Sequence, residues 1–210
     1  MRVKKYPQSH LVVSSETSKI VIDPGMITFK SGFKPEEFAD AQAFIFTHTH
    51  PDHLDPENVK AVVKDKPVFG NSDVAQTLEK MGINCTAVSD GQEFEAGGFK
   101  VKAVDLAHCA MQDGSPVPPN TGFLIDGVLF HPGDGDHAPA GLTSHNVALP
   151  IAGPTITLDG ALKFAQDVQA KVVIPIHNDF FKNDPEQFKT MAQGAGIEVR
   201  TLAAGEETTL

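Results

Sequence analysis

Residues 46–55 read FTHTHPDHLD and carry three histidines and two aspartates in ten positions. Residues two apart in an extended segment point to the same side, so His48 and His50 can face one cation. The proline that follows His50 stops a strand ladder from continuing and turns the chain, which directs Asp52 and His53 to a second position. Imidazole nitrogens and carboxylate oxygens are ligands of divalent zinc, iron and manganese. This stretch therefore predicts part of a site for two metal ions.

Three further residues of ligand type lie at the ends of predicted strands. His108 follows the run VKAVDLA, Asp134 follows VLFHPG, and His177 ends VVIPIH. Open α/β sheets place their sites at the carboxyl ends of strands, so we expect these side chains to meet the cluster at 48–53. The sequence thus predicts a metal site built from distant parts of the chain.

The two cysteines, Cys85 and Cys109, do not indicate a structural zinc site. The chain has no C-x-x-C pair, and we expect both residues to be free thiols. Cys109 adjoins His108, which raises the alternative of a thiolate ligand. Neighbouring residues on a strand point to opposite faces, so a small buried apolar side chain is the favoured interpretation of Cys109.

Short apolar and β-branched runs separated by turn residues predict the strands of the first half of the chain. These runs are 10–14, 19–23, 43–47, 67–70, 85–89 and 99–107. In the second half, Asp126-Gly127 joins two runs within 122–133 and predicts a type I′ hairpin turn. Further strands are expected at 146–151, 172–177 and near 198–202, and helices at 71–81, 157–170 and 183–193, with a shorter one after Pro56. This mixture predicts an α/β fold with helix-covered sheets in a single domain over residues 1–210.

Charge and composition narrow the expected partners. The formal net charge is −10 and the longest basic run is Lys4-Lys5, which does not suit a phosphate-backbone footprint. With no Trp and one Tyr, aromatic platforms for base stacking are scarce. No stretch approaches the ~20 apolar residues of a membrane span, and we recognise no signal peptide. We therefore expect a soluble, cytoplasmic protein that acts on a small molecule rather than on nucleic acid or a membrane.

The order of these motifs resembles a known superfamily. H-x-H-x-D-H, a strand-end His, a Gly-Asp after a hairpin strand and a late P-x-H are similar to the metallo-β-lactamase superfamily over nearly the whole chain. IDPG (22–25), HPGDG (131–135), LPIAGPTITLDGALKFAQD (149–167) and VVIPIH (172–177) resemble the branch that contains L-ascorbate-6-phosphate lactonase. The resemblance implies a four-layer αββα sandwich with a dinuclear metal site at one edge of its two sheets.

The resemblance also implies a role for each ligand. His48, His50 and His108 would hold the first metal, Asp52, His53 and His177 the second, and Asp134 would bridge them. Two divalent transition-metal ions are expected, with zinc as the first choice and manganese or iron as alternatives. Such a pair can share a water and present hydroxide to an electrophile, while Asp52 orients that hydroxide.

Some residues near these motifs depart from the pattern or have no assigned role. The branch often has Gly-His-Ser near the first strand, whereas this chain has Pro7-Gln8-Ser9. Asp23 is interpreted as a turn carboxylate or a partner of a ligand rather than a ligand itself. His137 could protonate a leaving group or bind an anionic substrate, but a solvated loop histidine is the favoured interpretation.

The predicted activity is hydrolysis of a small molecule such as an ester, lactone, amide, thioester or phosphodiester, with an anionic substrate as one option. One alternative is a nuclease of the same superfamily, against which the acidic charge weighs. Another is an iron-dependent redox enzyme, but the diiron relatives usually have Glu at the position of His50. A ligand-binding relative without catalysis would be expected to have lost ligands, and this chain keeps all seven. Substrate identity, leaving-group acid and oligomeric state stay open.

Overall fold

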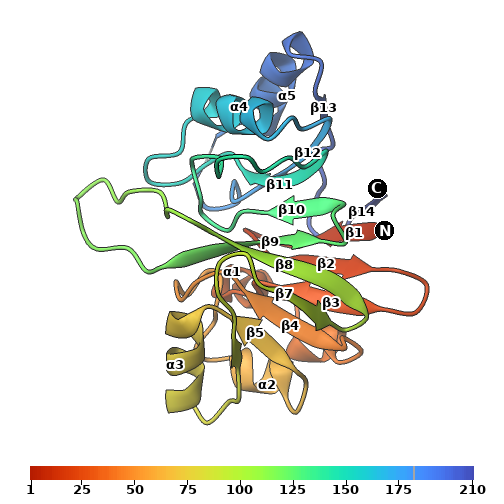
Figure 1. Cartoon of the computed structure of the whole chain (residues 1–210), viewed down its shortest axis with the longest axis vertical. Helices are drawn as coiled ribbons and strands as arrows, with labels where there is room; N and C mark the ends of the chain where they lie inside the picture. The colour runs from red at the N-terminus through yellow and green to blue at the C-terminus, as the bar shows by residue number, and fades with distance from the viewer. Residues whose placement is uncertain (182) are drawn as a thin grey trace.

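The computed structural model describes residues 1–181 and 183–210 of the chain. Within these residues two seven-stranded sheets pack face to face, and helices cover the outer face of each sheet (Figure 1). This arrangement confirms the predicted α/β sandwich of four layers. Among the described residues, no helix has both the length and the apolar character needed to cross a membrane.

The first sheet combines an antiparallel half with a parallel half. Its strands, in spatial order, are β14 (Glu207–Thr209), β1 (Arg2–Lys5), β2 (Leu11–Ser14), β3 (Lys19–Ile22), β4 (Ala43–Phe46), β5 (Val68–Gly70) and β6 (Thr86–Ala87). The pairs from β14 to β3 are antiparallel, and those from β3 to β6 are parallel. The parallel strands β3 and β4 therefore end at the same edge of the sheet, where Asp23 and Thr47 follow them.

The second sheet repeats this mixture. Its strands, in spatial order, are β13 (Glu198–Val199), β12 (Val172–Ile176), β11 (Asn146–Pro150), β10 (Leu129–His131), β9 (Asn120–Ile125), β8 (Phe99–Leu106) and β7 (Glu93–Ala96). The hairpin between β9 and β10 turns at Asp126 and Gly127, with φ of 50° and 67°. Positive φ at both central residues is the type I′ geometry, so the predicted hairpin turn is confirmed.

Side chains along the central strands point alternately to the two faces of each sheet, and they build three apolar layers. In β4, Ala43 and Ile45 point into the core between the two sheets, while Phe44 and Phe46 point to the helices outside the first sheet. A third apolar cluster, which includes Phe164 and Phe188, lies between the second sheet and its helices. Because the side-chain period of a strand is two, a strand with both faces buried is apolar throughout, as β4 is.

Three of the helices begin at a residue whose side chain accepts hydrogen bonds from the first turn. The helices outside the first sheet are α1 (Met26–Lys30), the 3-10 helix η1 (Pro35–Phe38), α2 (Val59–Val63) and α3 (Ser72–Lys80); those outside the second are α4 (Leu158–Asp167) and α5 (Pro185–Gly194). The Asn71 side chain accepts from the amides of Asp73 and Val74 and so caps α3. Thr157 and Asp184 cap α4 and α5 in the same way.

Five elements were not predicted from the sequence: β1, β7, β14, α1 and η1. The three strands are short, and lysine or glutamate occupies many of their positions, which hides the apolar alternation. β14 pairs with β1 from the opposite end of the chain, with Arg2 opposite Thr209. A pairing over that separation depends on the closed fold and leaves no local pattern.

Candidate metal centre

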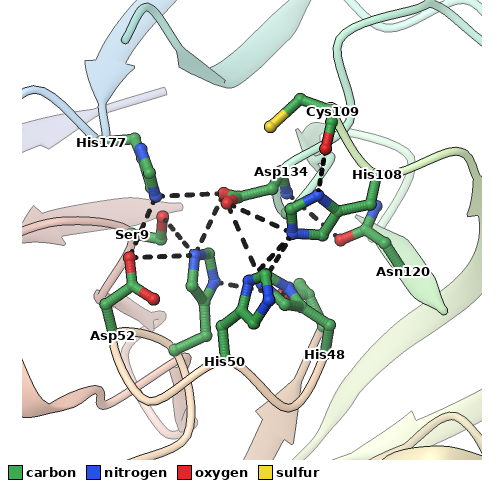
Figure 2. Close-up of polar contacts among 12 residues, drawn as sticks. Ser9, His48, His50, Asp52, His108, Cys109, Asn120, Asp134 and His177 are labelled. Atoms are coloured by element: carbon green, nitrogen blue, oxygen red, sulfur yellow. Dashed lines mark hydrogen bonds and ion pairs between the residues drawn. The ribbon is translucent and has the colours of Figure 1, made fainter. Parts of the chain in front are cut away.

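All seven predicted ligands converge at one edge of the two sheets. His48, His50, Asp52 and His53 follow β4, His108 follows β8, Asp134 follows β10, and His177 follows β12. Their donor atoms form two groups, each within 4.8 Å: His48, His50, His108 and Asp134 in one, and Asp52, His53 and His177 in the other. Figure 2 shows the Asp134 carboxylate between His177 and Asp52 on one side and the rings of His48, His50 and His108 on the other. The sequence thus identified a cluster that the fold assembles from both sheets.

Asp134 faces both groups of donors. Its Oδ1 atom lies 3.0 Å from His53 Nε2 and 3.3 Å from His177 Nε2. Its Oδ2 atom lies 3.6 Å from His108 Nε2 and 3.9 Å from His48 Nε2. One carboxylate thus directs a separate oxygen to each group, which is the arrangement that a bridging ligand requires.

The first group holds three ring nitrogens close together. His108 Nε2 lies 3.1 Å from His50 Nδ1 and 3.3 Å from His48 Nε2. A single proton can satisfy only one of these nitrogen pairs, whereas a cation can accept all three lone pairs. Burial, together with the neighbouring histidines, lowers the pKa of His48 and His50, which favours the neutral form that binds metal.

Carboxylates dominate the surroundings of the histidines in the second group. Burial opposes protonation of His53, but the Asp134 and Asp23 carboxylates outweigh it and raise the pKa of His53 well above its ordinary value. Burial likewise opposes charging of His177, yet Asp134 and Asp52 raise the pKa of His177 to about 9. These carboxylates therefore favour positive charge at the place where a cation would lie.

Two buried atoms in this group test whether a cation fits. Among the described residues, His177 Nε2 and Asp134 Oδ1 have no partner with hydrogen-bond geometry, although they lie 3.3 Å apart. Leaving buried polar atoms unpaired costs free energy, so most such atoms in proteins find a partner. A divalent cation between them would satisfy both, and the donor set therefore fits a metal.

The opposite ring nitrogens of two of these histidines are held by backbone carbonyl groups. His108 Nδ1 donates to the carbonyl of Cys109 at 2.7 Å, and His177 Nδ1 donates to the carbonyl of Ala152 at 2.8 Å. Since a carbonyl only accepts, each bond places the ring proton on Nδ1 and leaves the Nε2 lone pair directed into the cluster.

Asp23 performs the same task for His53. Its Oδ2 atom accepts from His53 Nδ1 and from Thr47 Oγ1, both at 2.7 Å. Its Oδ1 atom accepts from the Thr47 amide at 2.8 Å. Asp23 is fully buried and holds a ligand without joining either group of donors, as the sequence interpretation expected.

Gln8 is a site residue whose contacts the sequence did not reveal. Its Nε2 atom donates to Asp52 Oδ2 at 3.0 Å, and its carbonyl accepts from the His177 amide at 3.1 Å. Gln8, Asp23 and His177 have φ of 67°, 49° and 64°. Left-handed backbone at non-glycine residues is uncommon and is held in place by its surroundings, so these three positions indicate a locally strained site.

His131 supports the loop that presents Asp134. It donates from Nε2 to the carbonyl of Ser9 at 2.8 Å and accepts from the Gly133 amide at 3.1 Å. Asn120 Oδ1 accepts from the Asp134 amide at 3.2 Å. These buried contacts connect the turn after β10 to both sheets, which fixes where the carboxylate lies.

Two residues weighed in the sequence lie outside the cluster. Cys109 is free and fully buried, and burial raises the pKa of its thiol to about 12, so it stays protonated and apolar. The side chain of His137 is 86% exposed and pairs with Asp136 at 2.6 Å. Both favoured interpretations, a buried apolar thiol and a solvated loop histidine, agree with the structure.

A cleft of about 320 Å³ opens over the cluster. His50, Asp52, His108, Asp134 and His177 line its base, and most of the remaining lining is apolar. A small molecule can therefore reach the cluster through this cleft.

Comparison with known proteins matches both the sequence and the fold. The family model described as beta-lactamase superfamily domain matches residues 2–177. A UPF0173 metal-dependent hydrolase from Methanoregula boonei is 30% identical over 216 aligned positions, which cover 93% of this chain and 92% of that protein. A UPF0173 metal-dependent hydrolase from Thermoplasma acidophilum is 28% identical over 178 positions, with 79% of each protein covered.

Solved structures share the same architecture. The structure of Igni18, a metallo hydrolase from Ignicoccus hospitalis, has a TM-score of 0.76 to this chain at 22% identity, and covers 99% of this chain and 97% of that one. This likeness extends over essentially the full length of both molecules. It establishes a shared fold around the edge where the seven side chains meet.

Proposed function

This chain belongs to the family described as beta-lactamase superfamily domain, and from that premise we propose that it is a hydrolase that depends on two divalent metal ions. The curated relatives named above are metal-dependent hydrolases. In this proposal His48, His50 and His108 hold one ion, Asp52, His53 and His177 hold the other, and Asp134 binds both. The site takes ligands from both sheets, so residues 1–210 would act as one catalytic unit.

The observation that carries the proposal is the position of Asp134. Its two oxygens face the two donor groups separately, at 3.0 Å from His53 Nε2 and 3.6 Å from His108 Nε2. A single metal would use one side of this carboxylate and leave the other group of buried donors without a partner. Two ions account for all seven side chains at once.

The chemistry follows from this donor set. Two bound cations would supply Lewis acidity that polarises a substrate oxygen and activates a shared water near neutral pH. Nitrogen and oxygen donors suit zinc, and also manganese or iron.

Asp52 is the candidate proton acceptor. Its Oδ2 atom is held by Gln8 Nε2 at 3.0 Å and lies 3.2 Å from His177 Nε2, which leaves Oδ1 to accept a proton from the attacking water. Although burial opposes ionisation, the His177 ring lowers the pKa of Asp52. Asp52 would thus be ionised near neutral pH and ready to orient a water molecule.

Removal and return of metal tests the proposal. The full chain would be stripped with a chelator, reconstituted separately with Zn, Mn or Fe(II), and assayed on a neutral ester, a lactone, a thioester, an amide and a phosphodiester. We expect hydrolysis of at least one substrate that disappears on chelation and returns with metal. Equal hydrolysis by the stripped and reconstituted protein, or none by a preparation shown to contain two ions, would contradict it.

A further inference from the structure

The walls of the cleft carry information about the substrate. Seven apolar side chains line it: Met26, Ile27, Pro51, Met111, Pro154, Phe180 and Phe181. They come from the start of α1, from the loops after β4, β8 and β11, and from the segment after β12. Five separate segments thus supply apolar groups to one small space, which is the usual composition of a pocket for a small organic ligand.

The two phenylalanines form a shelf beside the metal ligands. The Phe181 ring stacks on the His177 ring, with centroids 5.7 Å apart and planes 13° apart. The Phe180 ring packs edge-on against Phe181 at 5.1 Å. Phe180 is 65% exposed, and it is the large apolar side chain that stands out as exposed among the described residues. An exposed aromatic ring at the mouth of a cleft offers apolar surface that a bound ligand can cover.

The walls of the cleft offer no cationic side chain to a charged group of the substrate. Among the described residues that line it, none is a lysine or arginine, and the charges of Asp52 and Asp134 would be balanced by the ions that they are proposed to hold. The neighbouring Lys5 is almost fully buried and pairs with Asp179 at 3.1 Å. A phosphate or carboxylate group on the substrate would therefore meet no free cationic side chain of the described lining.

From this geometry we propose that the substrate is an uncharged ester, lactone or thioester whose apolar acyl chain lies along the Phe180–Phe181 shelf. The inference rests on the proposed hydrolase function and narrows its substrate class. It departs from the sequence-based option of an anionic substrate. A cleft of about 320 Å³ is at the small end of ligand pockets, which suits one short or medium acyl chain.

The reaction is a simple hydrolysis. The oxygen of water forms a bond to the acyl carbon, and the bond from that carbon to the alkoxy oxygen or thiolate sulfur breaks. The leaving group takes one proton of the water and departs as an alcohol or thiol. The acyl part leaves as a carboxylic acid, which ionises in neutral solution, so no oxidant or reductant is needed.

A matched substrate series tests the proposed class. The metal-reconstituted full chain would be assayed with 4-nitrophenyl acetate, 4-nitrophenyl hexanoate and the 4-nitrophenyl monoester of adipic acid, which has hexanoate's length and a terminal carboxylate. Bis(4-nitrophenyl) phosphate represents phosphodiesters. We expect kcat/KM to rise at least about tenfold from acetate to hexanoate, because each methylene in an apolar pocket favours binding, and to fall at least about tenfold from hexanoate to the adipate ester.

Variants connect this preference to the shelf. In Phe180→Ala the hexanoate-to-acetate ratio of kcat/KM should fall several-fold. Phe33→Ala is the control, because Phe33 contacts Tyr6 and lies outside this cleft, and its ratio should match that of the parent protein. Melting curves of both variants would show that each is folded.

Failure of the substrate class and failure of the hydrolase proposal give different results. The inference would be overturned if the protein preferred acetate, the adipate ester or the phosphodiester. It would also be overturned if the hexanoate-to-acetate ratio of kcat/KM were unchanged in Phe180→Ala. Either result would leave the hydrolase proposal standing. No turnover of any ester, lactone, thioester, amide or phosphodiester would contradict the hydrolase. In that case, calorimetry with hexanoate and adipate would still test whether the cleft of the metal-loaded protein is an apolar binding site. Tighter binding of hexanoate that weakens in Phe180→Ala supports an apolar site. Equal binding of the two compounds rejects it.

Discussion

Replacement of Asp23 by asparagine should weaken metal binding without touching a ligand. The Oδ1 atom of Asp23 accepts from the Thr47 amide, and Oδ2 accepts from Thr47 Oγ1 and His53 Nδ1. An asparagine can present only one oxygen. Because the Thr47 amide can only donate, that oxygen must take the place of Oδ1, and the new NH2 group must face His53.

The consequence reaches the metal-facing side of the ring. An NH2 group opposite His53 Nδ1 favours an unprotonated Nδ1, so the ring proton moves to Nε2. That atom lies 3.0 Å from Asp134 Oδ1 and is the one proposed to bind metal. Loss of such a partner typically lowers metal affinity by about 10- to 100-fold, which corresponds to about 1.4 to 2.7 kcal/mol. The weakening should be confined to the ion held by Asp52, His53 and His177.

Competition with a chromophoric chelator measures this effect. The parent protein should release two ions with similar resistance, while Asp23→Asn should release one ion at about 10- to 100-fold lower chelator concentration. Asp55→Asn is a matched control, because Asp55 is also buried, accepts from the Glu57 amide at 2.8 Å, and contacts no ligand ring. Unchanged affinity for both ions in Asp23→Asn, or equal weakening in Asp55→Asn, would refute the reasoning.

Three further predictions concern other parts of the site and the fold. Asp134→Asn should lower kcat/KM by about 100-fold or more, because an amide nitrogen cannot bind a cation. The control Asp136→Asn should leave kcat/KM unchanged. Near-normal turnover by Asp134→Asn would place the bridge elsewhere. In Gln8→Asn the new residue tolerates the left-handed backbone, but its side chain is too short to reach Asp52. Activity should therefore fall about tenfold with little change in melting temperature. A large drop in melting temperature alongside the loss of activity would indicate a merely structural role. Burial, together with His131, lowers the pKa of His10 to about 3, so its contribution to stability is present above the unfolded pKa near 6.5 and is lost as the pH falls towards 3. His10→Phe should therefore reduce the loss of stability between pH 7 and pH 5 by about 2 kcal/mol in urea unfolding, and an unchanged pH dependence would contradict this.

Several of the candidate ligands could be predicted from sequence because they follow strands that are apolar on both faces, whereas the strand before His108 alternates buried and exposed residues. Runs such as AFIF and VVIPI are buried on both sides, so the first polar residue after each run marks the sheet edge. His48 and His177 are found in this way although they are far apart in the chain. The hairpin turn at Asp126-Gly127 was predictable because its backbone geometry restricts the residue types.

Contacts that depend on the closed fold could not be predicted. The bond from His131 to the Ser9 carbonyl joins residues 122 apart, and neither residue has a local pattern that reports it. Gln8 contacts Asp52 because the loop between β1 and β2 lies beside the loop after β4. The shelf of Phe180 and Phe181 lies in an irregular segment, where no periodicity shows which way the rings point. Sequence reasoning therefore found the donors and Asp23, but it missed Gln8, His131 and the rings that line the cleft.

The position and number of the bound ions test the central claim most directly. Crystals of the zinc-reconstituted full chain would be measured at the zinc absorption edge, and metal content would be determined on the same preparation. The account predicts two anomalous peaks, one on each side of the Asp134 carboxylate, and close to two zinc ions per chain. A single peak at full occupancy, or two peaks that share no contact with Asp134, would contradict it.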